Sequence, residues 1–294
     1  KGASPALMGE CAARDIHLCF LTPNGRFLAR VSGQSQGNVL LRKEQYRVSD
    51  DLARSCRIAR NMIFGKIFNS RWVLERTIRD HAMRVNAQEL STVSAQLQGQ
   101  LEGVRQIEQL DTLRGAEGVA SAAYFGVFDQ LILNQKDVFR FKGRSRRPPL
   151  DRVNAALSMT YTLLAHDCAS ALESVGLDAY VGFMHRDRPG RTSLALDLMV
   201  ELRAPLADRF VLTLINTRVL QQKHFKTQAD GAVWLTDDGR KALLSAWQSR
   251  KKVEITHPFL KEKMAWGLVP YVQALLLART LRGDLDGYPP FLWK

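Results

Sequence analysis

Residues 51–85 read DLARSCRIARNMIFGKIFNSRWVLERTIRDHAMRV, and they carry the clearest structural signal in the chain. Their apolar residues recur about every 3.6 positions, which is the period of a helix with one buried face. The stretch therefore predicts one amphipathic helix or two shorter ones. From Asp51 onward helical patterns follow one another with few strand signals, so the sequence predicts a mainly α-helical protein.

The outer face of this helix is predicted to be strongly basic. Residues 51–85 contain eight Lys and Arg residues against three acids. The basic residues are Arg54, Arg57, Arg60, Lys66, Arg71, Arg76, Arg79 and Arg84. Such a face is either an ordinary solvated surface or a surface that contacts phosphate groups, and the charge imbalance slightly favours phosphate contact.

The whole chain shares this charge bias, with 42 Lys and Arg against 29 Asp and Glu in 294 residues, a formal net charge of +13. Hydrophobic residues make up 46% of the chain, which supports a large core in about one or two domains. The excess charge indicates a polyanionic partner, nucleic acid first and an anionic membrane second. Because no uninterrupted apolar run approaches about 18 residues and no cleavable signal is visible, the sequence argues against a membrane.

The amino-terminal part has a different pattern. Residues Pro5–Ala13 are predicted as a short helix, and two apolar runs at 16–21 and 26–31 flank the turn Thr22–Gly25. Its Asn-Gly pair supplies the positive backbone angles of a tight turn, so these runs predict a β-hairpin. Tyr46–Asp50 is predicted as a linker, with Ser49 or Asp50 capping the next helix.

The cysteines indicate a reducing environment. Cys11, Cys19, Cys56 and Cys168 are scattered, with no CxxC pair and no adjacent histidine at ligand spacing. They are predicted to be reduced core thiols of a cytosolic protein, in preference to disulfides or a zinc site. The chain begins at Lys1 without an initiator methionine, so we expect a fragment whose natural beginning is missing.

Glu117 is a candidate functional residue. It lies among small residues in the run LRGAEGVASAAYF, residues 113–125, on what is predicted to be a buried helix. A carboxylate in an apolar setting is costly unless it is neutralised, hydrogen-bonded or bound to a metal. The sequence leaves these ways of stabilising it open.

A second lead is the basic loop FRFKGRSRRPP at residues 139–149. Arg144, Arg146 and Arg147 stand among aromatic residues, a pattern that fits a nucleic-acid backbone site, although an ordinary solvated loop is the alternative. Asn154 and Ser158 follow it, four residues apart on one helix face. They could orient a substrate or satisfy each other in the core, and taken alone they favour the core.

Farther along, His185 ends an apolar stretch, Asp197 lies inside another, and Glu201 follows one helical turn later. Together with Glu117 they could hold a divalent cation. The alternative is a satisfied core histidine and two paired acids. Spacing alone favours that alternative, because it does not show that the residues converge.

Five strings occur in order: GNVLLR at 37–42, LRGAEG at 113–118, RRPPLDRVNAALS at 146–158, GFMH at 182–185 and SLALDLM at 193–199. This set resembles the CRISPR-associated integrase family, the metal-dependent endonuclease that inserts new spacers, and most closely its type I-C-like members. The resemblance runs from about Gly37 to the C-terminus. The residues before Gly37 resemble the end of that family's amino-terminal β domain.

The resemblance implies that residues 1–45 are the remainder of a small, incomplete amino-terminal β domain and that residues 46–294 form an α-helical catalytic domain. It also implies a homodimer in a prokaryotic cytoplasm, double-stranded DNA partners (prespacer and CRISPR repeat), and a small dimeric CRISPR-associated protein that bridges two homodimers. The family's Mg²⁺ or Mn²⁺ is held by a helix Glu, a His and a later acid. Glu117 and His185 match the first two.

The third ligand does not match. In relatives the acid lies three residues after the Asp of the Asp-Leu-Met string, and here that position is Val200, which offers no lone pair. Glu201 is one residue farther, about 100° around a helix axis. Asp197 or Glu201 could substitute with altered geometry, the metal could bind weakly, or residue 200 could itself be an altered position. Weakened metal binding is favoured.

The reaction that the resemblance implies is attack of a prespacer 3′-hydroxyl on a phosphodiester at the repeat boundary. Glu117 and His185 would hold the cation, and Arg144, Arg146, Arg147, Asn154 and Ser158 would hold the strand. The alternative function is a DNA-binding scaffold of the same fold whose catalysis is impaired by Val200. A nonspecific basic DNA-binding protein is a more distant third.

Overall fold

The computed structural model describes residues 2–14, 16, 18–22, 27–31, 33 and 39–294. The helices are α1 (Pro5–Ala13), α2 (Val39–Asp50), α3 (Leu52–His81), α4 (Ala87–Arg105), α5 (Leu110–Gly126), α6 (Arg152–Ser174), α7 (Ser193–Leu202), α8 (Arg209–Asn216), α9 (Asp237–Lys251) and α10 (Val269–Arg282). The strands pair as antiparallel hairpins: β1 (Leu18–Leu21) with β2 (Phe27–Val31), β3 (Phe225–Thr227) with β4 (Val233–Leu235), and β5 (Glu254–Thr256) with β6 (Lys263–Ala265). The predicted fold class, mainly α with few short strands, is confirmed.

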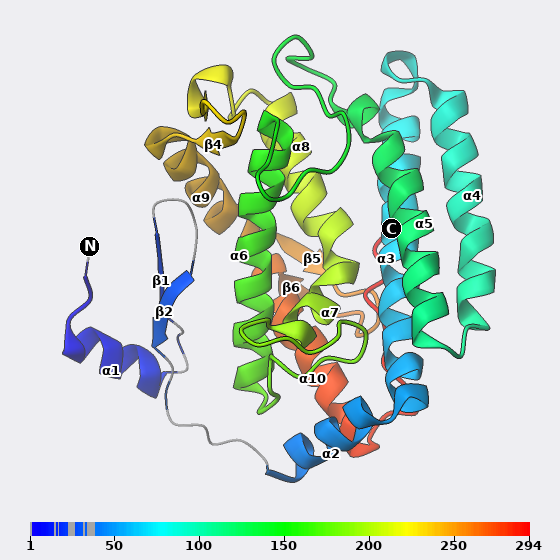
Figure 1. Ribbon diagram of the computed structural model, residues 1–294, viewed down its shortest axis with the longest axis vertical. Coiled ribbons are helices and arrows are strands. Elements are labelled where there is room, and N and C mark those ends of the chain that lie inside the picture. The colour runs from blue at the N-terminus through cyan, green and yellow to red at the C-terminus, as the bar shows by residue number, and fades with distance from the viewer. Residues whose placement is uncertain (1, 15, 17, 23–26, 32, 34–38) are drawn as a thin grey trace.

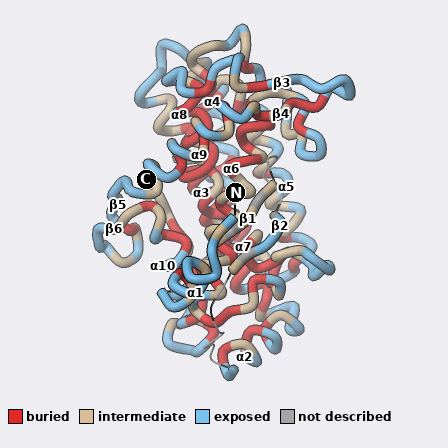
Figure 2. Tube along the Cα trace, turned by 90° about the vertical axis from the view of Figure 1, so that its left-hand side faces the viewer, coloured by how far each residue is buried: buried red, intermediate tan, exposed pale blue. Residues whose placement is uncertain are grey.

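Helix α3 runs lengthwise through the right-hand part of the helical body, behind α5 in Figure 1. It is a single helix of 30 residues, and Asp51 caps it by accepting hydrogen bonds from the amides of Ala53 and Arg54. Helices α4, α5 and α7 pack on α3, and α6 packs on α7 and α10. Figure 2 shows buried positions gathered along α3, α6 and α7. The buried side of α3 follows the helical spacing of Ile58, Met62 and Ile63, as predicted.

The amino-terminal predictions are largely confirmed. Helix α1 has the predicted bounds, and Leu18 pairs with Val31 in the predicted hairpin. The predicted Asn24-Gly25 turn lies outside the described residues. The division into a β domain at 1–45 and a catalytic domain at 46–294 stays a prediction.

The linker predicted at Tyr46–Asp50 is wrong, because these residues are the last turn of α2. The cap of the next helix is Asp51, which directly follows the two predicted caps, Ser49 and Asp50. Helix α2 forms because Leu41, Gln45 and Val48 share one face and are buried. Ser49 instead donates its hydroxyl to the carbonyl of Gly182, at 2.8 Å.

Helix α6 has local signals at both of its ends. The Asp151 carboxylate accepts a hydrogen bond from the amide of Asn154 at 2.7 Å, and the left-handed Gly176 (φ 86°) follows the helix end. Cys11, Cys56 and Cys168 are buried free thiols, as predicted. Within the described ranges, the helices are all too short or too polar to cross a membrane.

Candidate active site

Glu117 has a charged partner. It lies on α5, and the ammonium of Lys66, on α3, forms an ion pair with Glu117 Oε1. Lys66 Nζ also donates to Ser121 Oγ at 2.6 Å, and Ser121 Oγ donates to Glu117 Oε1 at 3.2 Å. The carboxylate that needed stabilisation is therefore neutralised by an ammonium from the neighbouring helix.

Burial and charge oppose each other in this pair. Burial lowers the pKa of Lys66 from 10.5 to about 8, although the Glu117 carboxylate pulls it upward. Burial also acts to raise the pKa of Glu117, but Lys66 outweighs it and the pKa lies below the usual 4.5. At neutral pH both groups are charged. A metal ion could bind Glu117 Oε1 only in competition with Lys66.

The placement of Lys66 corrects the predicted basic outer face of α3. Its side chain is only 10% exposed and points into the protein. Other basic residues of α3 also have partners within the protein. Arg54 pairs with Glu44, Arg71 pairs with Glu75, and Arg76 lies over the ring of Trp293. Part of the predicted phosphate-contacting face is therefore used within the protein.

His185 is brought to the helix that carries Glu117. Arg114, one turn before Glu117 on α5, donates two hydrogen bonds to the carbonyl of Met184, at 2.9 and 2.5 Å. Met184 is the neighbour of His185 in the chain. The structure thus places the Glu117 and His185 segments at one junction, which sequence spacing could not show.

Asp197 orients His185. Its side chain is 0% exposed, and Oδ1 lies 2.5 Å from His185 Nδ1 while it also accepts from the His185 amide at 3.0 Å. Oδ2 accepts from the amides of Phe183 and Met184, at 2.6 and 2.9 Å. The predicted role of Asp197 as a metal ligand is not supported, because its oxygens are enclosed by these donors. A carboxylate on one imidazole nitrogen instead fixes the ring and leaves the other nitrogen for chemistry.

Glu201 faces a different part of the molecule. Its carboxylate is 0% exposed and accepts hydrogen bonds from Gln273 Nε2 at 2.8 Å, from the Phe291 amide at 3.0 Å, and from the Tyr288 hydroxyl. Burial raises the pKa of Glu201 to about 7, against the lowering effect of these bonds. The prediction that Glu201 could be a metal ligand is not supported, because this acid anchors the C-terminal segment.

Val200 faces the Glu117 side of α7. It lines a small cavity with Lys66, Ser121 and Arg203. In the described part of the chain no group of three or more His, Cys, Asp or Glu residues is arranged to hold a metal ion. Glu117 and His185 suit a divalent cation by their chemistry. With valine at position 200 and Asp197 and Glu201 enclosed by other donors, Glu117 and His185 are the predicted ligands that remain.

The predicted strand-holding residue Arg144 points inward. Its guanidinium donates to the carbonyl of Ser145 at 2.7 Å, to Asn154 Oδ1 at 2.6 Å, and to Ser158 Oγ at 3.3 and 3.4 Å. It also lies over the ring of Tyr161, 5.1 Å from the centroid. Arg144 therefore organises the basic loop and does not project from it.

Asn154 has a structural position. It is 0% exposed, and its Nδ2 donates to the carbonyl of Gly143 at 2.8 Å and to Asp151 Oδ2 at 2.6 Å. Its Oδ1 accepts from Arg144 and from the amide of Ser145 at 3.1 Å. These bonds use both ends of the amide, so Asn154 pins the loop to α6 and the core interpretation is the better one.

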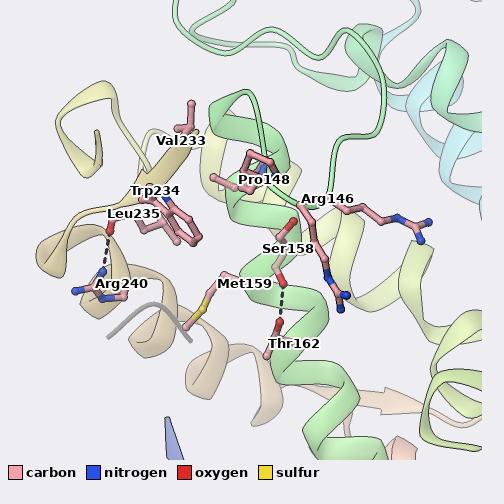
Figure 3. Close-up of a pocket in the computed structure, with 12 residues that line it drawn as sticks. Arg146, Pro148, Ser158, Met159, Thr162, Val233, Trp234, Leu235 and Arg240 are labelled. Atoms are coloured by element: carbon pink, nitrogen blue, oxygen red, sulfur yellow. Dashed lines mark hydrogen bonds between the residues drawn. The ribbon is translucent and has the colours of Figure 1, made fainter. Parts of the chain in front are cut away.

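Arg146 and Arg147 remain on the surface, where they line a pocket of about 350 Å³. Figure 3 shows Arg146 beside this pocket, with Ser158 and Met159 of α6 on one wall and Trp234 of β4 on another. Arg146 also lines the small cavity beside Val200. It therefore stands between the two hollows.

The structure adds residues to the site that no sequence motif indicated. Asp208 is buried and accepts a hydrogen bond from the Tyr161 hydroxyl at 2.5 Å, and burial raises the pKa of Asp208 to about 6. Arg203 stacks on the other side of this cluster, 5.3 Å from the centroid of the Tyr161 ring. The available signal was the spacing of Val200 and Arg203, three residues apart and so on neighbouring helix positions.

The sequence comparisons agree with one another. The profile of the family described as "CRISPR associated protein Cas1" matches residues 1–249. The protein named CRISPR-associated endonuclease Cas1 2 from Rhodospirillum rubrum is 55% identical over 295 residues, which cover 99% of this chain and 85% of the relative.

Two solved structures share the fold. A casposase bound to an integration product has a TM-score of 0.82 at 20% identity, covering 100% of this chain and 79% of that one. A chain of a Cas6-RT-Cas1–Cas2 complex has a TM-score of 0.78 at 23% identity, covering 99% of this chain and 31% of that one. At these identities the likeness concerns the fold alone.

Proposed function

The chain belongs to the CRISPR-associated Cas1 family, and from this we propose that it cuts and joins DNA during the insertion of new spacers. The proposed reaction is attack of a prespacer 3′-hydroxyl on a phosphodiester of the CRISPR repeat. The observation that carries the proposal is the contact of Arg114 with Met184, because it sets Glu117 and His185 at one junction. Arg146 lines a cavity together with Lys66, the ion-pair partner of Glu117.

The roles of the residues follow from their contacts. His185 is proposed to act through Nε2, because its Nδ1 is held by the Asp197 carboxylate. Glu117 and His185 are the residues we propose to hold Mg²⁺ or Mn²⁺, which when bound neutralises charge on the phosphate. Because Val200 leaves the set one ligand short, we propose that metal binding is weak and is strengthened by DNA phosphate, a common ligand of such ions.

The DNA strand is proposed to pass along Arg146 and Arg147. Arginine side chains beside an aromatic ring suit a nucleic-acid strand, since the guanidinium contacts phosphate and a ring can stack on a base. Trp234 lines the same pocket as these two arginines. Arg144, Asn154 and Ser158 support this path by shaping the loop and the pocket wall.

The proposed assembly is a homodimer in the prokaryotic cytoplasm, with a small dimeric bridging protein between two homodimers. The likeness to a Cas1–Cas2 complex and to a casposase on its integration product supports such partners and double-stranded DNA. The net charge of +13 fits DNA binding.

A second candidate function is a DNA-binding scaffold of the same fold with impaired catalysis. The observation that favours it is the pair of Val200 and Lys66. Val200 offers no ligand atom to a metal ion in the cavity that it lines. The carboxylate of Glu117 is already paired with the ammonium of Lys66. Such a protein would bind prespacer DNA and its partners but join strands slowly.

One assay separates the two candidates. Strand transfer of a short duplex with 3′-hydroxyl ends into a repeat-containing plasmid is measured in Mn²⁺ and in EDTA, for the wild type, Glu117→Gln and Val200→Glu. Val253→Glu, at a residue that is 45% exposed, is the matched control for an added acid.

Joining by the wild type in Mn²⁺, lost in EDTA and in Glu117→Gln, supports the enzyme. Joining only after Val200→Glu supports the scaffold and marks residue 200 as the missing ligand. Binding of DNA without joining by any of these proteins, Val200→Glu included, rules out the integrase function for this chain.

A further inference from the structure

The turn after α7 is unusual. Residues Arg203–Asp208 form a π-helical turn, a rare conformation that is most often found as a short insertion at functional sites. Pro205 lies within it and cannot donate a backbone hydrogen bond, which loosens the regular ladder. The turn brings the side chains at its two ends, Arg203 and Asp208, to the same tyrosine, Tyr161.

Arg203 is held in place without an acid partner. Tyr161 carries two guanidinium groups, those of Arg144 at 5.1 Å and Arg203 at 5.3 Å from the ring centroid. Arg144 donates hydrogen bonds to the carbonyl of Ser145 and to Asn154 Oδ1. Within the described ranges the side chain of Arg203 forms no ion pair and no hydrogen bond. Its Nε is buried and has no hydrogen-bond acceptor. A rigid, half-buried guanidinium with free donors is built to receive an anion.

The cavity beside Arg203 has the size and charge for part of a phosphate. Its lining includes Lys66, Arg146 and Arg203, with Asp208 as the acid among them. Its volume is about 20 Å³, which holds about one water-sized group. A whole nucleotide does not fit, whereas one non-bridging phosphate oxygen does. The remaining phosphate atoms would lie at the mouth, where Arg146 stands.

Val200 lines the same cavity as these cations. An acid at that position would pair with Arg203 or Lys66, or share a cation with Glu117. With valine at this position Arg203 has no acid partner there, whereas Lys66 is already paired with Glu117. The same substitution that weakens a metal site therefore strengthens an anion site at the same place.

We propose that Arg203 binds a phosphodiester of the DNA strand beside Glu117, in an anion subsite that it forms with Lys66 and Arg146. The inference rests on the proposed function, because it requires a DNA strand at this site. It goes further in making strand binding there independent of metal. Arg203 is proposed as a positioning residue that holds the DNA strand near the phosphodiester that reacts. Its guanidinium is held by the Tyr161 ring.

The test measures DNA affinity in EDTA. A fluorescein-labelled duplex with a single-stranded 3′ end is titrated with wild type, Arg203→Met, Arg203→Lys and Lys241→Met over a salt series. Lys241, on α9 and 81% exposed, is the matched loss of one charge on another element. We expect Arg203→Met to weaken binding roughly tenfold and to lower the salt slope by about one ion. Arg203→Lys should recover part of the loss, and Lys241→Met should stay within about twofold of wild type.

A methylphosphonate scan identifies the contacted phosphate. Each phosphate near the 3′ end is replaced singly by an uncharged methylphosphonate. One position should weaken wild-type binding and leave Arg203→Met unaffected, because the partner is already absent.

If Arg203→Met binds like Lys241→Met while the wild type binds and joins DNA, this inference is wrong and the proposed function stands. If Arg203→Met loses affinity equally at every methylphosphonate position, its effect is general and the subsite is also refuted. Failure of the wild type to bind DNA at all refutes the proposed function first. Matching thermal unfolding of Arg203→Met and wild type shows that the loss of affinity is not caused by misfolding.

Discussion

Replacing Glu201 with glutamine is expected to remove much of the change in stability between about pH 4.5 and about pH 7. The Glu201 carboxylate is fully buried, and its donors are the Tyr288 hydroxyl, Gln273 Nε2 and the Phe291 amide. Glutamine has nearly the same shape but no proton to bind or release in this range. Its rearranged hydrogen bonds change stability by an amount that does not depend on pH.

The magnitude follows from the two pKa values. Burial raises the pKa of Glu201 from 4.5 to about 7 in the folded protein. Between these values the folded protein keeps the proton and the unfolded chain releases it, so the free energy of unfolding falls as pH rises. A difference of about 2.5 units, at about 1.36 kcal/mol per unit, gives a loss of about 3 kcal/mol. Above about pH 7 the contribution is constant.

The assay is urea unfolding of wild type and Glu201→Gln at one protein concentration and at intervals across this range. The difference in unfolding free energy, wild type minus Glu201→Gln, should fall by about 3 kcal/mol as pH rises. Glu102→Gln, at an exposed position of α4, is the control and should run nearly parallel to wild type. If wild type and Glu201→Gln also run parallel, the carboxylate is not enclosed as described.

Three further changes test other parts of the site. Asp197→Asn should lower strand transfer about 10- to 100-fold through a misoriented His185 while DNA affinity is unchanged; an equal fall in affinity would contradict the orienting role. Gly65→Ala should destabilise the protein by about 1–3 kcal/mol in urea unfolding, because a Cβ there would lie 2.8 Å from Glu201 Oε2. A variant as stable as wild type would show that α3 and α7 can separate freely. Asn154→Ala leaves buried groups unpaired at about 1–3 kcal/mol each, and limited proteolysis should cut the loop at 143–150 faster than in wild type.

The sequence predicted the parts of the fold that depend on local spacing. Helix α3 could be read because its apolar residues repeat with the helical period, and α6 because its cap and its terminal Gly176 are local signals. Helix α2 could not be read in the same way. Its core face includes Gln45, which is 0% exposed and donates to the carbonyls of Asp178 and Val181, each at 2.8 Å. A glutamine satisfied by carbonyls more than a hundred residues away looks polar in sequence, so the segment resembled a linker.

The candidate site shows the same limit. Glu117 was recognisable as a carboxylate that needed a partner, because its neighbours are small and apolar. Its partner Lys66 was assigned to solvent, since a lysine among several arginines on one helix usually faces water. No local sequence signal indicates that the ammonium of Lys66 turns inward. The pairing is a tertiary fact, made by the packing of α5 on α3.

Helix α7 explains why neither remaining acid compensates for Val200. Successive residues are about 100° apart on a helix, so positions 197, 200 and 201 project in different directions. In this structure each direction has its own occupant: Asp197 meets the His185 loop, Val200 meets the cavity beside Lys66, and Glu201 meets the C-terminal segment. Turning α7 to bring Glu201 into the cavity would withdraw Asp197 from His185. Glu201 therefore cannot serve as the third ligand of the proposed metal site without releasing His185 from Asp197, and a change at residue 200 itself is the direct way to supply that ligand.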